Sequence, residues 1–359
     1  MASDGTFVED TFLHSDTSMV YFQEIVESSF WFNLLFSKIG AVLNIFHLIV
    51  LTRKTMMTTS INVIMIGIAG CDLFLMLHLI KASYTWVPPE GSDCSPPPTL
   101  FEMRFNWFLN SAHSGFRQCS AWLAVLLALI NYLIVTDITN QNSKFSKKGY
   151  GYKTIAITFL MSSAVSCLSY FNYKFVMTST WHPKTTCEEY SADWEEPIYS
   201  QKYIDLFEIH DELFSMMRLI GEGVFLKLLP CILLPTVTGL LIYELKKTAK
   251  KFASSAVSAA RQEMRKSRQD RSSIIVVFIA ITFLLSEFPT GFFDIVAAIW
   301  HDDPRAEKVS QTVAFMCDAI FAANSSLHCL IYFSMSVQYR KTVFNLLTFP
   351  CSKRVSFPE

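Results

Sequence analysis

The chain has 359 residues, of which 51% are hydrophobic and 17% are charged, and it contains 31 Phe against 12 Gly. This composition indicates a polytopic membrane protein and argues against a soluble enzyme. The net charge of −1 says little by itself, but the distribution of charge along the chain is informative, and no nucleic-acid partner is expected.

Residues 1–30 contain no Lys or Arg and six acids, so no cleavable signal peptide is expected there. About 20 apolar residues cross the hydrocarbon of a bilayer as a helix. The segment 61–80 has this length and contains one charge, Asp72, which is costly in lipid and so marks a functional position. Six further segments are predicted to span the membrane: 31–51, 99–135, 154–176, 213–245, 272–300 and 309–335.

The third span is polar over its first half, which contains Arg104, His113 and Arg117. Such a helix must be shielded by its neighbours, so it is expected to be the central helix of the bundle. The predicted fold is therefore an all-α membrane protein, a bundle of seven transmembrane helices.

Lys and Arg predict the orientation, because they concentrate in cytoplasmic loops. The connections after the first, third and fifth spans, together with the C-terminal tail, contain 19 Lys and Arg residues. The N-terminal segment and the connections after the second, fourth and sixth spans contain four. The N-terminus is predicted outside and the C-terminus in the cytoplasm. Three regions follow: an extracellular segment (1–30), the seven spans (31–335), and a cytoplasmic membrane-surface helix and tail (336–359).

Several motifs occur in a specific order. Asn44 in the first span and Asp72 in the second are intramembrane polar residues, and the seventh span ends in the segment 324–332, which closes with Tyr332. Four longer stretches are RKTMMTTSINVIMIGIAGCDL (53–73), KLLPCILLPTVTGLLIYELKK (227–247), SEFPTG (286–291) and HCLIYFSMSVQYRKT (328–342). Together they resemble the nematode serpentine receptors of class w, which are rhodopsin-like G-protein-coupled receptors related to FMRFamide-type neuropeptide receptors.

The chain departs from that pattern at three positions that matter for activation. The central Arg of the third-span motif is replaced by Asn131, and His328 stands where the seventh span of relatives has Asn before Pro. Glu287 occupies the place of the aromatic switch two residues before Pro289. The resemblance therefore implies a receptor, with Asn131, Pro289 and Tyr332 as candidate activation residues.

The resemblance also implies a polar core in the membrane. Its candidate members are Asn44, Asp72, Ser120, Asn324, Ser325 and His328. One carboxylate with hydroxyl and amide oxygens suits a hard cation such as sodium. A hydrogen-bonded core with water and no ion is the open alternative, because His328 replaces an oxygen ligand.

A second set of ionisable residues is expected at the depth of the ligand pocket within the helix bundle. Its members are His113, Arg117, Glu222, Glu287, Asp294 and Asp318. Glu287, Gly291 and Asp294 share one helical face, and the glycine is expected to leave room against it. Arg117 is placed opposite Glu287 by the resemblance, either as part of a ligand site or as an ion pair that fixes packing. For Lys227, the expected roles are ligand contact, snorkelling or a local pair with Glu222.

Three cysteines lie outside the spans. Cys94 and Cys187 are in outer loops, where the compartment is oxidising, and a disulfide between them is expected, with two free thiols as the alternative. Cys351 follows the amphipathic segment 336–349, which is predicted to lie on the membrane, and it is either palmitoylated or free.

The predicted function is a plasma-membrane receptor for a basic or amidated neuropeptide, with heterotrimeric G proteins and membrane lipids as partners. The acidic outer segments favour such a cationic ligand. A chemosensory receptor for a small environmental ligand is the alternative. A seven-span metal-dependent hydrolase using His47, Asp72, His78 and His328 is a remote one. No cofactor is expected other than the sodium ion near Asp72, and no metal site is firm.

Overall fold

The structure is a computed structural model, and it describes residues 5–85, 94–137, 144–183, 187, 191, 193–203, 220–253, 280–300 and 303–348. Within these residues the chain is mostly helical. The labelled helices are α1 (Gly5–Leu51), α2 (Ser60–Thr85), α3 (Leu100–Thr136), α4 (Lys148–Phe171), α6 (Leu229–Ala253), α8 (Pro304–Met335) and α9 (Val337–Thr348).

Three further helical pieces are present. A 3-10 turn, Lys144–Ser146, precedes α4, and a π-helical segment, Glu222–Leu228, runs directly into α6. A helix over Ala280–Ile299 lies between α6 and α8. Seven of the described helices are long and apolar enough to cross a membrane, so the predicted number of spans is confirmed.

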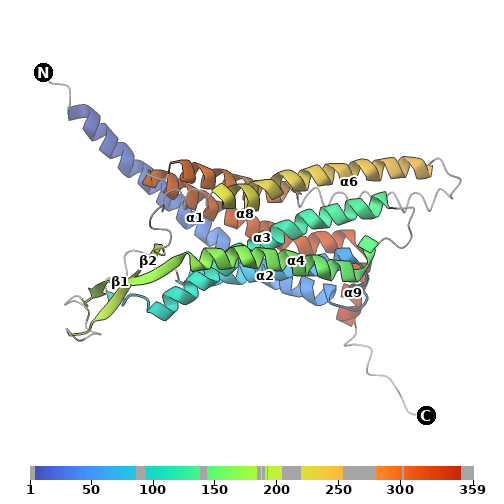
Figure 1. The fold of residues 1–359 in the computed structure, drawn as a ribbon, viewed down its shortest axis with the longest axis horizontal. Helices are drawn as coiled ribbons and strands as arrows, with labels where there is room; N and C mark the ends of the chain where they lie inside the picture. The colour runs from blue at the N-terminus through green and yellow to red at the C-terminus, as the bar shows by residue number, and fades with distance from the viewer. Residues whose placement is uncertain are drawn as a thin grey trace, which may run out of the picture.

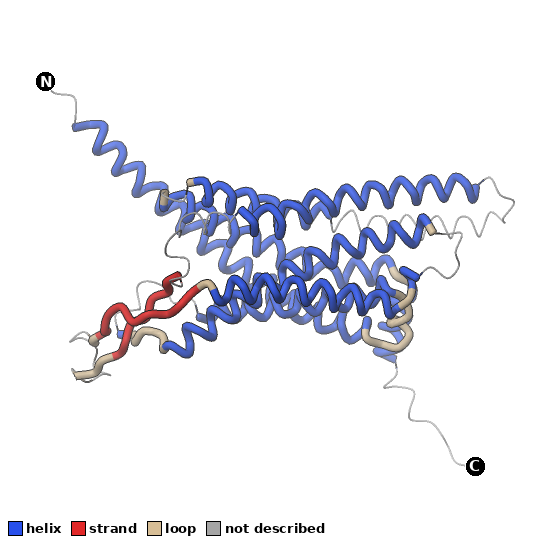
Figure 2. Tube along the Cα trace, viewed as in Figure 1, coloured by secondary structure: helices blue, strands red, loops and turns tan. Residues whose placement is uncertain are grey.

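The helices run side by side along the long axis of the molecule (Figures 1 and 2). Helix α3 packs against α2, α4 and α6, which is the predicted central position. The expected shielding of its polar first half is found only in part, because Arg117 is largely buried whereas Arg104 near the start of the helix is exposed. Helix α1 starts at the end where the strands lie, whereas α9 lies at the opposite end of the bundle (Figure 1).

The start of α3 is fixed by local chemistry. The prolines at 96–98 cannot join a helix interior, and Thr99 follows them as the N-cap. Its side chain accepts from the Glu102 backbone N–H at 3.3 Å, and the Glu102 carboxylate accepts from the Thr99 N–H at 2.8 Å. This reciprocal capping box places the first turn of α3 immediately after the proline run.

A β-hairpin departs from the all-α prediction. The predicted fourth span, 154–176, is too long, because α4 ends at Phe171 and β1 (Tyr173–Trp181) begins two residues later. Strand β1 pairs antiparallel with β2 (Glu196–Tyr203), with an irregular register between Met177 and Ser179. Aromatic and β-branched residues favour a strand, and a partner strand from the loop supplies the hydrogen bonds.

Small residues allow close packing at two helix contacts. A Cβ on Gly40 of α1 would lie 2.8 Å from Ser326 Oγ of α8. A Cβ on Gly291 would lie 2.9 Å from Lys227 Cβ and 3.2 Å from the Gly223 carbonyl oxygen. The expectation that Gly291 leaves open room is therefore wrong, because the π-helical segment fills that space.

Candidate functional site

The central feature of the bundle is a charge cluster around Arg117 of α3. Its Nε donates to Glu287 Oε1 at 2.8 Å, and its Nη1 donates to Asp318 Oδ1. Glu287 comes from the helix Ala280–Ile299 and Asp318 from α8, so one guanidinium joins three helices. The Arg117 side chain is 13% exposed, Glu287 3% and Asp318 17%. Charges this deep are expected to be paired, and Asp318 is the carboxylate most open to a ligand.

The guanidinium is also held by an aromatic ring. The guanidinium carbon of Arg117 lies 5.4 Å from the ring centre of Phe321, within the distance of a cation–π contact. Phe321 lies three residues after Asp318, so the two side chains share one face of α8. Arg117 keeps one buried nitrogen, Nη2, without a hydrogen-bond partner among the described residues.

A second ion pair lies beside this cluster. Lys227 Nζ is 2.5 Å from Asp294 Oδ2, and Ser310 Oγ donates to Asp294 Oδ1 at 3.2 Å. Lys227 therefore pairs with Asp294 and not with Glu222, which was one of its expected partners. The close approach of Gly223 and Gly291 brings the π-helical segment against the helix Ala280–Ile299, and this contact places Lys227 beside Asp294.

Two of the predicted ligand residues have other neighbours. Ser169 Oγ of α4 donates to Glu222 Oε1 at 3.4 Å, so this contact turns Glu222 toward α4. The His113 ring lies 4.4 Å from the ring of His78 in α2, and His78 Nε2 is 3.0 Å from Asn110 Oδ1. The six predicted residues therefore form the Arg117 cluster, the Lys227–Asp294 pair and two separate contacts.

A polar core lies farther along the same helices. Asp72 is 1% exposed, and its two oxygens accept from Ser120 Oγ at 2.8 Å and Ser325 Oγ at 3.0 Å. Asn44 Nδ2 donates to Ser325 Oγ at 2.9 Å, and His328 Nδ1 lies 3.3 Å from Asp72 Oδ2. The structure thus brings five of the six predicted members into one network.

The sixth member, Asn324, contacts another helix instead. Its Oδ1 accepts from Thr282 Oγ1 at 2.7 Å, although Asn324 lines the same small cavity as Asp72 and His328. The bond ties α8 to the helix Ala280–Ile299. Thr282 was not singled out in the sequence, because a lone Thr in an apolar helix gives no signal of its partner.

The oxygens beside Asp72 fit a sodium ion only in part. Asp72, Ser120 and Ser325 supply oxygens, which hard cations prefer. His328 presents ring nitrogens, and neither of them has a hydrogen-bond partner among the described residues. The cavity has room for about one water molecule or small cation. Oxygens of this kind suit a sodium ion, whereas a ring nitrogen is a poor sodium ligand.

The predicted activation residues lie on three helices. Asn131 is near the end of α3, and Pro289 is inside the helix Ala280–Ile299. Tyr332 of α8 packs edge-on against His47 of α1, with ring centres 5.4 Å apart. The His47 Nδ1 atom lies 2.9 Å from the hydroxyl of Tyr339 in α9.

Tyr339 is a functional candidate that the sequence did not reveal. It is fully buried, and its hydroxyl lies 3.4 Å from Cys329 Sγ of α8 as well as beside His47. Burial raises the pKa of the Tyr339 hydroxyl, which keeps it protonated. A single side chain thus fixes α9 to α1 and α8, at the end of the bundle away from the hairpin (Figure 1).

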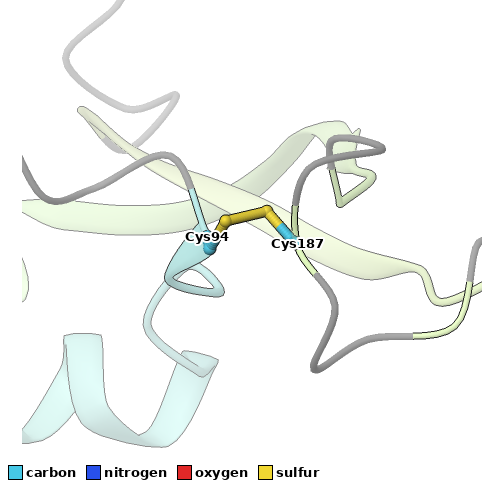
Figure 3. The surroundings of a disulfide bond; sticks show 2 residues. All are labelled: Cys94 and Cys187. Carbon is cyan, nitrogen blue, oxygen red and sulfur yellow. A yellow bond between two sulfur atoms is a disulfide. The ribbon is translucent and has the colours of Figure 1, made fainter.

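A disulfide closes the opposite end. Cys94 precedes α3 and Cys187 lies between β1 and β2, and their Cα atoms are 5.4 Å apart (Figure 3). The bond ties the hairpin to the segment that leads into α3. Cys351, the predicted palmitoylation site, lies outside the described residues.

The residues considered for a metal hydrolase do not converge. Asp72 and His328 lie in the polar core, His47 faces Tyr339 and His78 faces His113. Within the described residues, no group of three or more His, Cys, Asp or Glu side chains is arranged to hold a metal ion.

Comparison with known proteins supports a receptor. Residues 31–350 match the family described as the serpentine type 7TM GPCR chemoreceptor Srw. The chain is similar to the G-protein coupled receptor dmsr-1 of Caenorhabditis elegans, with 23% identity over 376 residues that cover 93% of this chain and 72% of that protein. The family match spans most of the chain, and the seven apolar helices agree with it. This multi-pass membrane protein therefore belongs to the Srw family of seven-transmembrane G-protein-coupled receptors, and it is a receptor rather than an enzyme.

Proposed function

We propose that this receptor recognises a basic or amidated neuropeptide at the Arg117 cluster and passes the signal to heterotrimeric G proteins. The observation that carries the proposal is the charge balance of the cluster. Arg117 binds two carboxylates, Glu287 and Asp318, whereas Lys227 and Asp294 neutralise each other. One negative charge is left in excess, which favours a cationic ligand.

A peptide ending in Arg-Phe-amide has the matching groups. Its guanidinium can bind a carboxylate through two parallel hydrogen bonds, and Asp318 is the most open carboxylate of the cluster. Its neutral terminal amide presents a carbonyl oxygen, which can accept from the unpartnered Nη2 of Arg117. Its Phe ring would meet an aromatic side chain such as Phe321.

The hairpin end of the bundle is the proposed extracellular end. The α1–α2 connection, which contains Arg53 and Lys54, meets α9, since Gln338 Nε2 donates to the Thr55 carbonyl at 2.5 Å. The basic residues therefore gather at the α9 end, as expected of a cytoplasmic face. The acidic segments 1–30 and 177–212 are proposed for the other face, where they would raise the local concentration of cations.

We propose that the signal passes through the helices that contribute residues both to the Arg117 cluster and to the polar core around Asp72. Helix α3 carries both Arg117 and Ser120, and α8 carries Asp318 followed two turns later by Asn324 and Ser325. The helix Ala280–Ile299 binds α3 through Glu287 and α8 through Thr282. A ligand cation that competes with Arg117 for Glu287 or Asp318 would loosen this junction and alter the packing around Asp72.

The cytoplasmic partner surface is proposed from charge and exposure. Nine basic residues occur between 246 and 271, although only those up to residue 253 are described. Val337, Phe344 and Leu347 of α9 are exposed, which supports a helix lying on the membrane. Asn131 stands where relatives have Arg, so coupling is expected to depend on other residues of this face.

The test is a ligand screen with a second-messenger readout that compares amidated basic peptides with small volatiles. For a basic peptide, Asp318→Asn is expected to lower potency by about tenfold, which corresponds to about 1.4 kcal/mol. Potency should also fall as ionic strength rises. Asp137→Asn is the matched control, because it removes one charge at the far end of α3. A peptide whose potency ignores Asp318→Asn would contradict the proposed site.

A chemosensory role is the second candidate, and the description of the matched family as chemoreceptors favours it. A small neutral ligand has no charge to place on Asp318, so Asp318→Asn and added salt should leave its potency unchanged. An activating ligand with that behaviour would replace the peptide proposal.

A further inference from the structure

A groove between α3 and α4 lies apart from the charge cluster. Its floor is made of small side chains, namely Ser111, Ala112 and Gly115 of α3 with Ser163 and Ser166 of α4. A Cβ on Gly115 would collide with Ser166 Oγ, so the two helices touch along this floor. The groove has a volume of about 360 Å³, near the lower end of the range of about 300–1,000 Å³ typical of small-molecule sites.

The walls of the groove are aromatic. Phe108, Tyr170 and Phe171 lie toward the hairpin end, whereas Phe116 and Phe159 lie deeper in the bundle. The ring centres of Phe116 and Phe159 are 5.8 Å apart, and those of Phe108 and Tyr170 are 6.2 Å apart. Phe108, Phe159 and Phe171 are exposed, and because α3 and α4 are both membrane spans, we expect this open side of the groove to face lipid.

Two hydroxyl groups in the floor lack partners. Ser111 is 8% exposed, and neither its Oγ nor the buried Oγ of Ser166 has a hydrogen-bond partner among the described residues. A buried hydroxyl without a partner is costly, and in lipid no water is available to satisfy it. These two groups call for a ligand atom that both donates and accepts, as a hydroxyl does.

The groove excludes charged headgroups. Its lining contains no Lys, Arg, His, Asp or Glu, so a phosphate or a carboxylate would be buried without a partner, which is unfavourable. The occupant therefore has a neutral polar head, and the small side chains of the floor beside aromatic rings suit a rigid apolar body.

The depth of the hydroxyls fits a lipid that stands upright in the membrane. Ser166 precedes the end of α4 at Phe171 by five residues, or about 8 Å along the axis. The interfacial region on each side of a bilayer is about 5–8 Å deep. A lipid hydroxyl at that level would meet Ser111 and Ser166, while the apolar body reaches Phe159, about 10 Å farther along α4.

We propose that the α3–α4 groove binds a membrane sterol, with its hydroxyl at Ser111 and Ser166 and its ring system packed along the aromatic side chains. Helix α3 separates this groove from the charge cluster, because Phe116 faces the groove and the next residue, Arg117, binds Glu287. Sterol occupancy would thus act on the helix that carries the ligand site. Binding itself does not depend on which ligand activates the receptor.

The first experiment uses full-length receptor in lipid nanodiscs with a photoactivatable cholesterol analogue. Labelled peptides are expected to map to 108–116 and 159–171, with competition by unlabelled cholesterol but not by its 3-hydroxyl epimer or by diacylglycerol. Equal competition by diacylglycerol would show that the occupant is not a sterol. Labelling spread evenly over the lipid-facing helices would show ordinary boundary lipid, and either result overturns the proposal.

A matched pair of variants tests whether the sterol binds in the α3–α4 groove. Ser163→Phe fills the floor of the groove and is expected to reduce labelling about tenfold, the effect of 1.4 kcal/mol. Leu168→Phe adds the same ring at an exposed position of α4 that does not line the groove, and it should leave labelling unchanged. The double variant Ser111→Ala with Ser166→Ala should abolish the preference for cholesterol over its epimer. Equal labelling in the wild-type protein and Ser163→Phe would place the sterol elsewhere.

A third measurement needs no variant and so does not depend on folding of Ser163→Phe. Cys167 lines the groove and is exposed, whereas the other free cysteines of the described chain are buried. Cholesterol is expected to slow alkylation of Cys167 by a membrane-permeable maleimide, followed by peptide mass spectrometry. An alkylation rate that is the same with and without cholesterol would contradict the proposal.

Discussion

Arg117 Nε donates to Glu287 Oε1 at 2.8 Å, and this bond joins the central helix to the helix Ala280–Ile299 across 170 residues of sequence. Since Arg117 also binds Asp318, removing the arginine leaves two buried carboxylates unpaired. Arg117→Met is expected to cost about 3–5 kcal/mol, as measured when one partner of a buried pair is lost. Thermal unfolding of purified receptor measures this loss.

The exchange Arg117→Glu with Glu287→Arg is expected to restore only part of that stability, because the carboxylate introduced at 117 would face Asp318. Arg104→Met is the control on the same helix, since Arg104 is exposed and surface substitutions usually change stability by less than about 0.5 kcal/mol. Full rescue by the exchange would show that Asp318 is not a partner of Arg117.

A substitution at Gly291 tests the close contact between the π-helical segment and the helix Ala280–Ile299. In Gly291→Ala, the new methyl group would lie 2.9 Å from Lys227 Cβ, and overpacking of this kind costs about 1–3 kcal/mol. Gly239→Ala is the matched control, because nothing lies within 4 Å of a Cβ at that position of α6 and alanine favours a helix. A lower unfolding temperature is expected for Gly291→Ala, and no loss for Gly239→Ala. Equal effects would mean that Gly291 does not set the contact.

The Cys94–Cys187 disulfide closes a loop of 93 residues, and its loss is expected to cost about 2–5 kcal/mol. Cys94→Ser and Cys187→Ser should each reduce surface expression, and the double variant should be no worse than either one. Cys167→Ser, which removes a free thiol, should leave expression unchanged. Additive losses would argue against the bond.

The polar core is proposed to admit a sodium ion through the oxygens of Asp72, Ser120 and Ser325. Replacing sodium with potassium in the assay buffer is then expected to change agonist affinity, and Asp72→Asn should abolish the effect. His328→Asn should enlarge it, because an oxygen ligand replaces a nitrogen. If affinity is the same in both salts for the wild-type protein and His328→Asn, the core holds hydrogen bonds and water alone.

Orientation is tested with epitope tags. A tag at residue 2 is expected to be reachable by antibody on intact cells, whereas a tag after Glu359 should be reachable only after permeabilisation. This result is expected because Arg53 and Lys54 lie in the connection that meets α9, whereas residues 1–30 contain no Lys or Arg. The reverse pattern of access would contradict the proposed extracellular hairpin.

Seven spans were predictable because a bilayer requires long apolar helices that satisfy their own hydrogen bonds. The central place of α3 was predicted from its polar first half, but only Arg117 follows that reasoning, since Arg104 is exposed. The polar core was suggested by family resemblance, and its hydrogen bonds through Asp72 agree with that grouping. The β-hairpin was not predictable, since its two strands stabilise each other only when paired.

Contacts between distant helices were decided only by the tertiary structure. The spacing of Glu287, Gly291 and Asp294 correctly placed them on one face, but periodicity does not say what packs there. The backbone contact of Gly223 with Gly291 selects Asp294 as the partner of Lys227. Likewise, Asp318 joins Arg117 only because α8 lies against the site. The sequence alone determined which residues must be buried in the membrane, whereas helix packing determined which of their charges meet, because pairing depends on distances that sequence spacing within one helix does not fix.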